Sequence, residues 1–173
     1  MKDKSIIGAL SSSLGLTNSK RIMKLEICGQ AGQMEVRYLI KIRTGTFRYT
    51  NFYVLCERLP ESMHGTCSIC RASVKEDIFH LFLDCGKYTE ERKEFLKLDL
   101  LTREMGLNCD QPSYRKLLLR LILGEDPPEK GGKTTMSRIT STLRYLKIVI
   151  PKRAGLLSLA FSNDPGPPGE DEQ

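Results

Sequence analysis

Apolar residues recur every three or four positions along much of this chain, which is the spacing of one face of an α-helix. The clearest stripe lies just before Gly124, opposite a basic face, and consists of Tyr114, Leu117, Leu118, Leu121 and Ile122. Glycine directly after such a stripe is typical of a helix end. Strand-like runs of Val, Ile and Thr are scarce. The pattern therefore predicts a mainly α fold in the form of a small helical bundle.

Four further segments have helical periodicity. They are 33–43, ended by Gly45; 50–58, stopped by Pro60; 89–105; and 136–150. The second of these is expected to bury Phe52, Tyr53, Leu55 and Cys56. Pro151 is expected to end or kink the last helix, because proline lacks the N–H that a helix interior needs. The apolar seam of that helix is expected to pack onto the bundle, with a docking or dimerisation face as the alternative.

The two ends of the chain differ from its middle in composition. Residues 1–30 are expected to form a weakly ordered or helical lead-in, because the apolar stretch Ile6–Leu10 is too short and too interrupted by polar residues for a signal peptide or a membrane span. Residues 31–155 are expected to form one helical domain. Residues 156–173 are expected to be a disordered tail, because its acidic, Pro and Gly residues offer little to bury. An exposed Pro/Gly linker is expected over 125–133.

The net charge favours partners that carry phosphate groups. The chain has a formal charge of +6, and residues 164–173 contain four acids and no base, so the rest carries +10. Such an excess attracts nucleic acids at long range without giving sequence specificity. Much of it precedes residue 67, at Lys20, Arg21, Lys24, Arg37, Lys41, Arg43 and Arg48. Lys41, Arg43 and Arg48 are the candidate phosphate contacts. Tyr49 and Tyr88 are the candidates for stacking on bases.

Three cysteines and one histidine have the spacing C-x2-C-x9-H-x4-C, formed by Cys67, Cys70, His80 and Cys85. Two residues between the first cysteines allow a tight turn whose N–H groups can hydrogen-bond to the sulfurs. Zn²⁺ favours thiolate and imidazole ligands, and four of them leave no position for a reacting water. The segment 67–85 therefore predicts a structural Zn²⁺ site, a CCHC zinc knuckle at the centre of the helical domain. The alternatives are reduced core cysteines beside an ordinary histidine, or His64 as a substitute ligand.

The residues around the histidine indicate how it is presented. Ser73–Glu76 has the S-x-x-E form of a capping box, which predicts a short helix that begins there and carries His80. Five residues of an ideal helix turn through about 500°, so His80 and Cys85 would point in different directions. The helix is therefore expected to loosen near Cys85, where Gly86 permits a turn.

The remaining cysteines, Cys28, Cys56 and Cys109, lie outside this spacing and are expected to be free thiols. Cys56 falls on an apolar helical face and is expected in the core. Thiols that stay available as zinc ligands fit a reducing compartment better than an oxidising one. We therefore expect an intracellular protein, in the nucleus or the cytoplasm.

Several of these features occur together in one known family. They are, in chain order, Leu39–Gly45 (LIKIRTG), Cys67 and Cys70, the run Glu76–Cys85 (EDIFHLFLDC), Tyr88 and Arg92. In this order they resemble the zinc-binding region that follows the reverse transcriptase in non-LTR (LINE-like) retrotransposons. Thr46 stands where that family often has histidine. The resemblance implies folding around one zinc ion and an accessory role in holding an RNA or DNA template.

The sequence indicates a binding module and not an enzyme. It contains no Tyr-x-Asp-Asp polymerase turn, no endonuclease cluster of acids and histidines, and no ribonuclease H carboxylate set. The leading hypothesis is a zinc-stabilised, reverse-transcriptase-derived module that binds RNA or DNA through phosphates. The alternatives are a protein-interaction or purely structural module, and a retroelement remnant without independent activity.

Overall fold

The computed structural model describes residues 32–108, 111, 113–125 and 133–162, and every regular element in these ranges is helical. The elements are α3 (Gln33–Arg43), α4 (Thr50–Leu55), η1 (Glu61–Met63), η2 (His80–Asp84), η3 (Gly86–Tyr88), α5 (Thr89–Glu91), η4 (Arg92–Leu96), α6 (Leu98–Met105), α7 (Tyr114–Ile122) and α8 (Lys133–Ser162). Of the short elements, η1 and η3 are 3₁₀ turns, and η2 and η4 are π-helical. The predicted mainly α fold is confirmed for this part of the chain. The lead-in over 1–30, linker residues 126–132 and the tail from residue 163 lie outside it.

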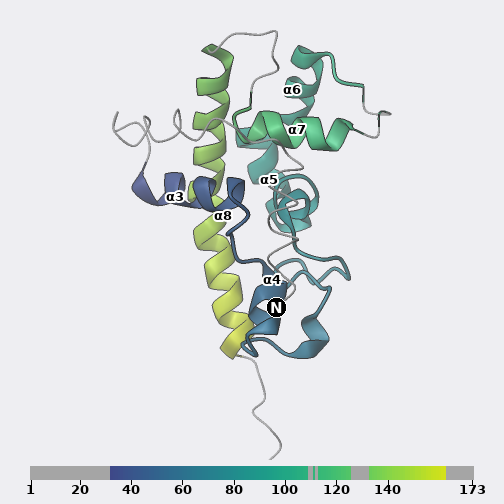
Figure 1. The fold of residues 1–173 in the computed structure, drawn as a ribbon, viewed down its shortest axis with the longest axis vertical. Helices are drawn as coiled ribbons and strands as arrows, with labels where there is room; N and C mark the ends of the chain where they lie inside the picture. Colours follow the sequence, from purple (N-terminus) through teal and green to yellow (C-terminus); the bar gives the residue numbers. More distant parts are fainter. Residues whose placement is uncertain (1–31, 109–110, 112, 126–132, 163–173) are drawn as a thin grey trace, which may run out of the picture.

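The longest helix, α8, forms the axis of the molecule (Figure 1). α3 crosses it near its middle, α6 and α7 lie beside the end where α8 begins, and α4 lies near its other end. One face of α8 is core, with buried side chains at Ile139, Leu143, Tyr145, Leu146, Val149 and Ile150. The predicted packing of this seam onto the bundle is confirmed. The alternative of a docking face along the same seam is wrong, because the bundle already covers it.

The end of α8 differs from the sequence prediction. Pro151 lies inside the helix, which continues to Ser162, so proline does not end it and the ordered part extends past residue 155. Pro151 is exposed, so solvent can reach the side of the helix where its hydrogen bond is missing. Leu157 is buried and attaches this last part to the bundle. None of the described helices combines the length and hydropathy needed to cross a lipid bilayer.

Helices α3 and α7 have the predicted bounds, whereas α4 is shorter than expected. α4 ends at Leu55 and buries Thr50 and Val54. Phe52, Leu55 and Cys56 are exposed, so their predicted burial is wrong. A six-residue helix offers one narrow face to the core, and positions 50 and 54 occupy that face here.

The predicted helix over 89–105 is broken in two. α5 continues into the π-helical η4, which buries Arg92 and Leu96. Lys97 then adopts a left-handed conformation with φ of 46°, and α6 starts at Leu98 in a new direction. Both halves place an apolar residue in the core, Leu96 before the break and Leu101 after it. Glu90 and Lys93 form an ion pair of 3.0 Å on the exposed surface of α5 and η4.

Candidate metal centre

Cys67 and Cys70 lie in a turn that follows η1. The Arg71 N–H donates to the Cys67 carbonyl oxygen at 2.9 Å, and the Cys67 N–H donates to the Ala72 carbonyl oxygen at 3.1 Å. Within the turn, the backbone N–H groups of Cys70 and Ile69 act to lower the pKa of Cys67, which is the effect of N–H groups directed at its sulfur. The backbone therefore holds the Cys67 sulfur in place and directs both sulfurs to the same side of the turn.

His80 and Cys85 lie at the two ends of η2. The Cys85 N–H donates to the His80 carbonyl oxygen at 2.8 Å, and this bond spans five residues as in a π-helix. The turn is therefore wider than an α-helical turn. The predicted loosening of the helix near Cys85 is confirmed, and it takes the form of a π-helical turn that brings both side chains to one centre.

The helix that carries His80 begins later than predicted. Its first helical residue is Ile78, so the capping box over Ser73–Glu76 is wrong. Asp77 Oδ1 accepts the His80 N–H at 2.8 Å, which is the bond made by an N-cap residue. Asp77 therefore caps this helix, while the neighbouring Glu76 is buried in the interior.

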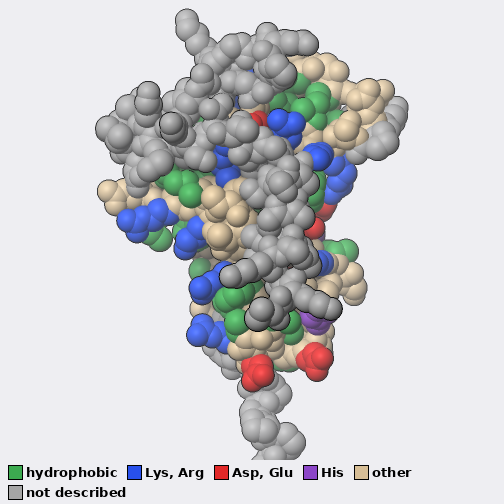
Figure 2. Space-filling model, in the orientation of Figure 1, with side chains coloured by type: hydrophobic (Ala, Val, Ile, Leu, Met, Phe, Trp, Pro, Cys, Tyr) green, Lys and Arg blue, Asp and Glu red, His purple; other side chains and the backbone are tan. Residues whose placement is uncertain are grey.

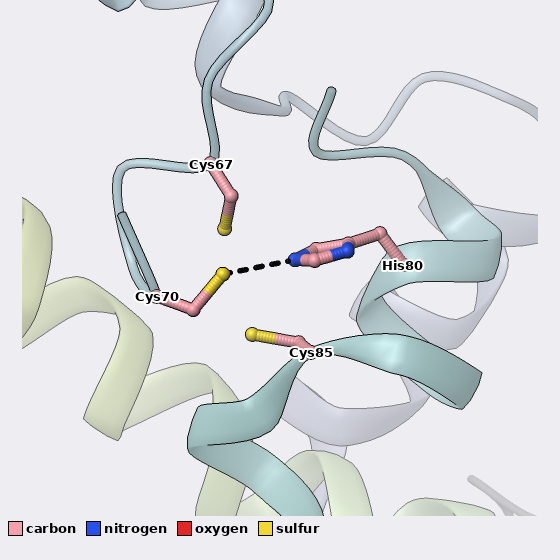
Figure 3. A group of neighbouring side chains, drawn as sticks. All are labelled: Cys67, Cys70, His80 and Cys85. Atoms are coloured by element: carbon pink, nitrogen blue, oxygen red, sulfur yellow. Dashed lines mark hydrogen bonds between the residues drawn. The ribbon is translucent and has the colours of Figure 1, made fainter. Parts of the chain in front are cut away.

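The four predicted ligands meet in space. Their donor atoms all lie within 4.8 Å of one another, and Figure 3 shows the side chains of Cys67, Cys70, His80 and Cys85 directed to a common point. The Cys70 Sγ and the His80 Nε2 are 3.4 Å apart. In a tetrahedral zinc site these two kinds of ligand atom are about 3.6 Å apart, given the usual Zn–S and Zn–N bond lengths. The spacing of the donors therefore fits a small tetrahedral cation.

The candidate centre is mostly enclosed. Cys67, His80 and Cys85 are 0%, 6% and 1% exposed, and Cys70 is partly exposed. A surface hollow of about 970 Å³ borders Cys70 and His80, and its wall includes Phe79. A cation can reach the donors from this side without unfolding the surrounding helices.

Hydrogen bonding shifts the pKa values of two of the thiols in opposite directions. The pKa of Cys67 is raised, first by the hydrogen bond with Cys85 and second by burial of its side chain. The same hydrogen bond lowers the pKa of Cys85, against the effect of burial, and the Lys87 N–H supports its thiolate. The Cys67 thiol therefore holds its proton more firmly than the Cys85 thiol does. A bound cation would replace this proton, because metals bind cysteine as thiolate.

A buried ion pair supports the segment between the ligands. Arg153 of α8 donates from Nε and Nη2 to the two carboxylate oxygens of Glu76 at 2.7 and 2.8 Å. The N–H and the hydroxyl of Thr50 both donate to Glu76 Oε2 at 2.7 Å. Burial alone would raise the pKa of Glu76, but Arg153 and Thr50 hold it below its ordinary value. In the sequence, the only sign of this role of Glu76 was its place in an acidic pair directly before the apolar run.

Side chains after the last ligand also attach the centre to the bundle. Arg92 is buried and donates from Nη1 to the Cys85 carbonyl oxygen at 2.6 Å. The Tyr145 hydroxyl of α8 donates to the Leu81 carbonyl oxygen at 2.6 Å. Tyr88 is 1% exposed, so its predicted role in stacking on bases is wrong. Because Tyr88 and Arg92 are buried, both support the segment that carries the four donor residues from inside the protein.

The predicted phosphate contacts are found in two different environments. Lys41 and Arg48 are exposed, and each lies over an aromatic ring, Tyr38 and Phe52 respectively. Arg43 is 4% exposed and donates to the Leu123 carbonyl oxygen and, at 2.6 Å, to Glu125.

The prediction of a phosphate contact is therefore wrong for Arg43, because its guanidinium is already paired inside the protein. Two cysteines outside the motif, Cys28 and Cys109, lie outside the described residues. Cys56 is a free, exposed thiol, and the exposed His64 does not belong to the group of four donors.

Among the described residues, the four-donor group is the one set of three or more His, Cys, Asp or Glu side chains close enough to hold a metal ion. Three of its members are cysteines, which favours a thiophilic cation. Comparisons with protein-family models, with curated protein sequences and with solved structures found no match to this chain.

Proposed function

We propose that Cys67, Cys70, His80 and Cys85 bind one Zn²⁺ ion, and that this zinc knuckle stabilises the helical domain. The observation that carries the proposal is the convergence of four donor atoms within 4.8 Å from two separate segments. Four protein ligands complete a tetrahedral shell, so the ion has no open position for substrate or water. The role of the zinc is then structural, because it joins the turn at Cys67 to η2.

The zinc proposal is tested with the purified chain. We expect one zinc per chain by elemental analysis, and a large loss of melting temperature when a chelator removes it, because structural zinc contributes about 10 kcal/mol or more of apparent binding energy. Cys70→Ser and His80→Ala should lose both metal and fold. Cys56→Ser is the matched control, since this exposed cysteine lies outside the group. A folded, metal-free protein would contradict the proposal.

We further propose that the chain is a nucleic-acid-binding module similar to the accessory region of retrotransposon reverse transcriptases. The exposed Lys41 and Arg48 support phosphate binding. Figure 2 shows that Lys and Arg side chains follow one another along the side where α3 lies and down toward the end of α8. A basic surface of this kind binds phosphates through electrostatic attraction and release of counterions.

A protein-interaction module is the second candidate function, and a different observation favours it. α4 leaves Phe52 38% and Leu55 64% exposed, and Met34 of α3 is 54% exposed. Single exposed apolar residues are common on protein surfaces, so they support this function less than the charges support nucleic-acid binding. A gel shift at low salt separates the two: absence of any RNA or DNA complex for the zinc-loaded protein would favour the interaction module.

A further inference from the structure

A second hollow lies where the first half of α8 faces η4 and α6. Its volume is about 290 Å³, and it shares no lining residue with the candidate metal centre. Lys97, Ser137, Arg138, Ser141 and Arg144 contribute its basic and hydroxyl groups. The wall thus combines three cationic side chains with the hydroxyl groups of Ser137, Ser141 and Thr142, of which Thr142 already donates to the Ile122 carbonyl oxygen.

Arg138 is the unusual member of this group. All three of its guanidinium nitrogens are enclosed, each with less than 1 Å² accessible, and none has a hydrogen-bond partner. Among the described residues it is the only arginine with all three nitrogens in this state; Arg43 and Arg120 each have one. A guanidinium carries five N–H donors and is always charged, so leaving all of them without acceptors is costly.

The hollow offers two carboxylates, but neither satisfies this arginine. Glu94 and Glu104 line the same hollow and are both exposed, and neither forms an ion pair with Arg138. Water is a weak substitute, because buried arginines are normally paired with an anion. Arg138 lines the hollow, and because its guanidinium is unpaired, it would lose no hydrogen bond by turning toward a bound anion.

We propose that this hollow binds a phosphate group, with the Arg138 guanidinium as its principal ligand. A planar guanidinium forms two parallel hydrogen bonds to a phosphate, which fills donors that are otherwise unpaired. Lys97 is placed at the rim by its left-handed backbone, and Arg144 lies two turns after Ser137 on the same face of α8. Ser137 and Ser141 supply short-range donors to the remaining phosphate oxygens. The proposal is independent of the zinc site and adds a second, enclosed contact to the exposed one at Lys41 and Arg48.

Inorganic phosphate is the probe for this site. We expect phosphate to raise the melting temperature of the zinc-loaded protein more than chloride does at equal ionic strength, and to show line broadening in ³¹P NMR on binding. Arg138→Gln should weaken phosphate binding by about tenfold or more, because hydrogen bonds to a charged partner are lost. Arg58→Gln is the matched control, since Arg58 is exposed and lies outside the hollow.

If Arg138→Gln does not fold, a substitution at the rim of the hollow can test the proposal instead. Arg144→Gln removes an exposed charge, should fold normally, and should weaken phosphate binding about two- to fivefold. Equal responses of the wild type to phosphate and chloride would overturn the proposal. The proposal would also be overturned if Arg138→Gln had the same phosphate affinity as the control Arg58→Gln. If Arg138→Gln does not fold, Arg144→Gln takes its place in this comparison. If Glu94→Gln or Glu104→Gln destabilised the protein as much as Arg138→Gln does, that result would identify a carboxylate of the protein as the partner of Arg138. It would then overturn the proposal.

A labelled single-stranded oligonucleotide identifies the source of the phosphate. If Arg138→Gln weakens oligonucleotide binding as well, the group is a phosphodiester of a nucleic acid. If only inorganic phosphate responds, the site binds free phosphate. These results do not depend on the zinc content, which elemental analysis measures separately, so failure of the zinc proposal and failure of this one are distinguishable.

Discussion

Two buried carboxylates, Glu76 and Glu125, each pair with an arginine that lies far away in the sequence. The Arg43–Glu125 pair joins α3 to the end of α7, and the Arg153–Glu76 pair joins α8 to the ligand segment. Removing two charges from water is expensive, and a buried pair recovers the cost only when its hydrogen bonds are complete. Glu76 meets this condition because Thr50 and Arg153 fill both of its oxygens.

Loss of the Glu76 charge should therefore destabilise the fold. We expect Glu76→Gln to lower the free energy of unfolding by about 3 to 5 kcal/mol, because it leaves Arg153 buried without a counterion. Denaturant titration of the zinc-loaded protein measures this. Glu90→Gln is the control: Glu90 pairs with Lys93 on the surface, and its loss should change stability by less than about 1 kcal/mol. Equal effects of the two substitutions would contradict the prediction.

The same carboxylate makes stability depend on pH. The pKa of Glu76 is below its ordinary value of 4.5 in the folded protein, so the unfolded chain binds this proton first as the pH falls. The stabilisation is thus complete above pH 4.5 and is lost as the pH drops from 4.5 toward the folded pKa. The stability difference between wild type and Glu76→Gln should shrink over that range. A constant difference would show that Glu76 does not titrate there. Because both proteins keep the zinc ligands, ligand protonation cancels in the comparison.

At the scale of elements, this chain changes direction where its helices end or break. Gly124 follows α7 with φ of +85°, a conformation that L residues rarely adopt. A Cβ there would lie 2.5 Å from Ile139 Cγ1 of α8. Gly106 ends α6 with φ of +61°, but a Cβ there meets nothing within 4 Å. Comparing the two glycines thus separates the cost of backbone strain, which both positions share, from the cost of steric contact, which arises only at Gly124.

Gly124→Ala should cost more stability than Gly106→Ala. Both substitutions place a Cβ in the left-handed region, which costs about 1 to 2 kcal/mol. Gly124→Ala also places a Cβ against the Ile139 side chain, so Ile139 or α7 must shift, and overpacking of this kind adds about 1 to 3 kcal/mol. Thermal and chemical denaturation of the two variants side by side test this. Similar losses for both would mean that α7 and α8 can separate slightly without cost.

Pro151 leaves one backbone hydrogen bond of α8 unmade in an exposed helix interior. Pro151→Ala restores that bond and should raise the free energy of unfolding by up to about 3 kcal/mol. Ala154→Pro is the opposite control, because it places the same defect at another exposed position of α8 and should lower stability by about 3 kcal/mol or more. A destabilised Pro151→Ala variant would indicate that the fold needs a bend at this residue.

At the scale of the whole molecule, α8 connects the parts that the sequence presents separately. It packs against α3, η4 and α7, and it reaches the ligand segment through Tyr145 and Arg153. A metal ion bound at Cys67 would therefore stabilise the domain through α8 and not only its own loop. The exposed charged surface of the described residues includes Lys41 and Arg48.

Nucleic-acid binding should depend on salt through these exposed charges. We expect log affinity to fall linearly with log salt concentration, and the double variant Lys41→Gln/Arg48→Gln to flatten the slope by about 1.5 to 2 units, similarly for all sequences. Lys93→Gln/Arg103→Gln removes two exposed charges from the η4 and α6 side and should leave the slope unchanged. An effect confined to one nucleic-acid sequence would indicate base contacts instead of phosphate contacts.

The sequence by itself determined the local features of this protein. Helical periodicity placed α3 and α7, and the Cys and His spacing identified four side chains that do converge. These features depend on residues close together in the chain, so the spacing alone carries the information. The need for a looser helix before Cys85 also followed from rotation per residue, and the π-helical turn meets it.

Only the tertiary structure decided which polar residues are buried and where helices break. Arg43 looked like part of a basic surface, yet Glu125 lies beside it across 82 positions. Glu76 looked like a cap, but Arg153 draws it into the core, and Asp77 takes the capping position. Pro151 did not end α8, because packing after the proline holds the helix. Each of these outcomes depends on contacts between distant segments, whose energies exceed the local preferences of about 1 kcal/mol that a sequence pattern reports.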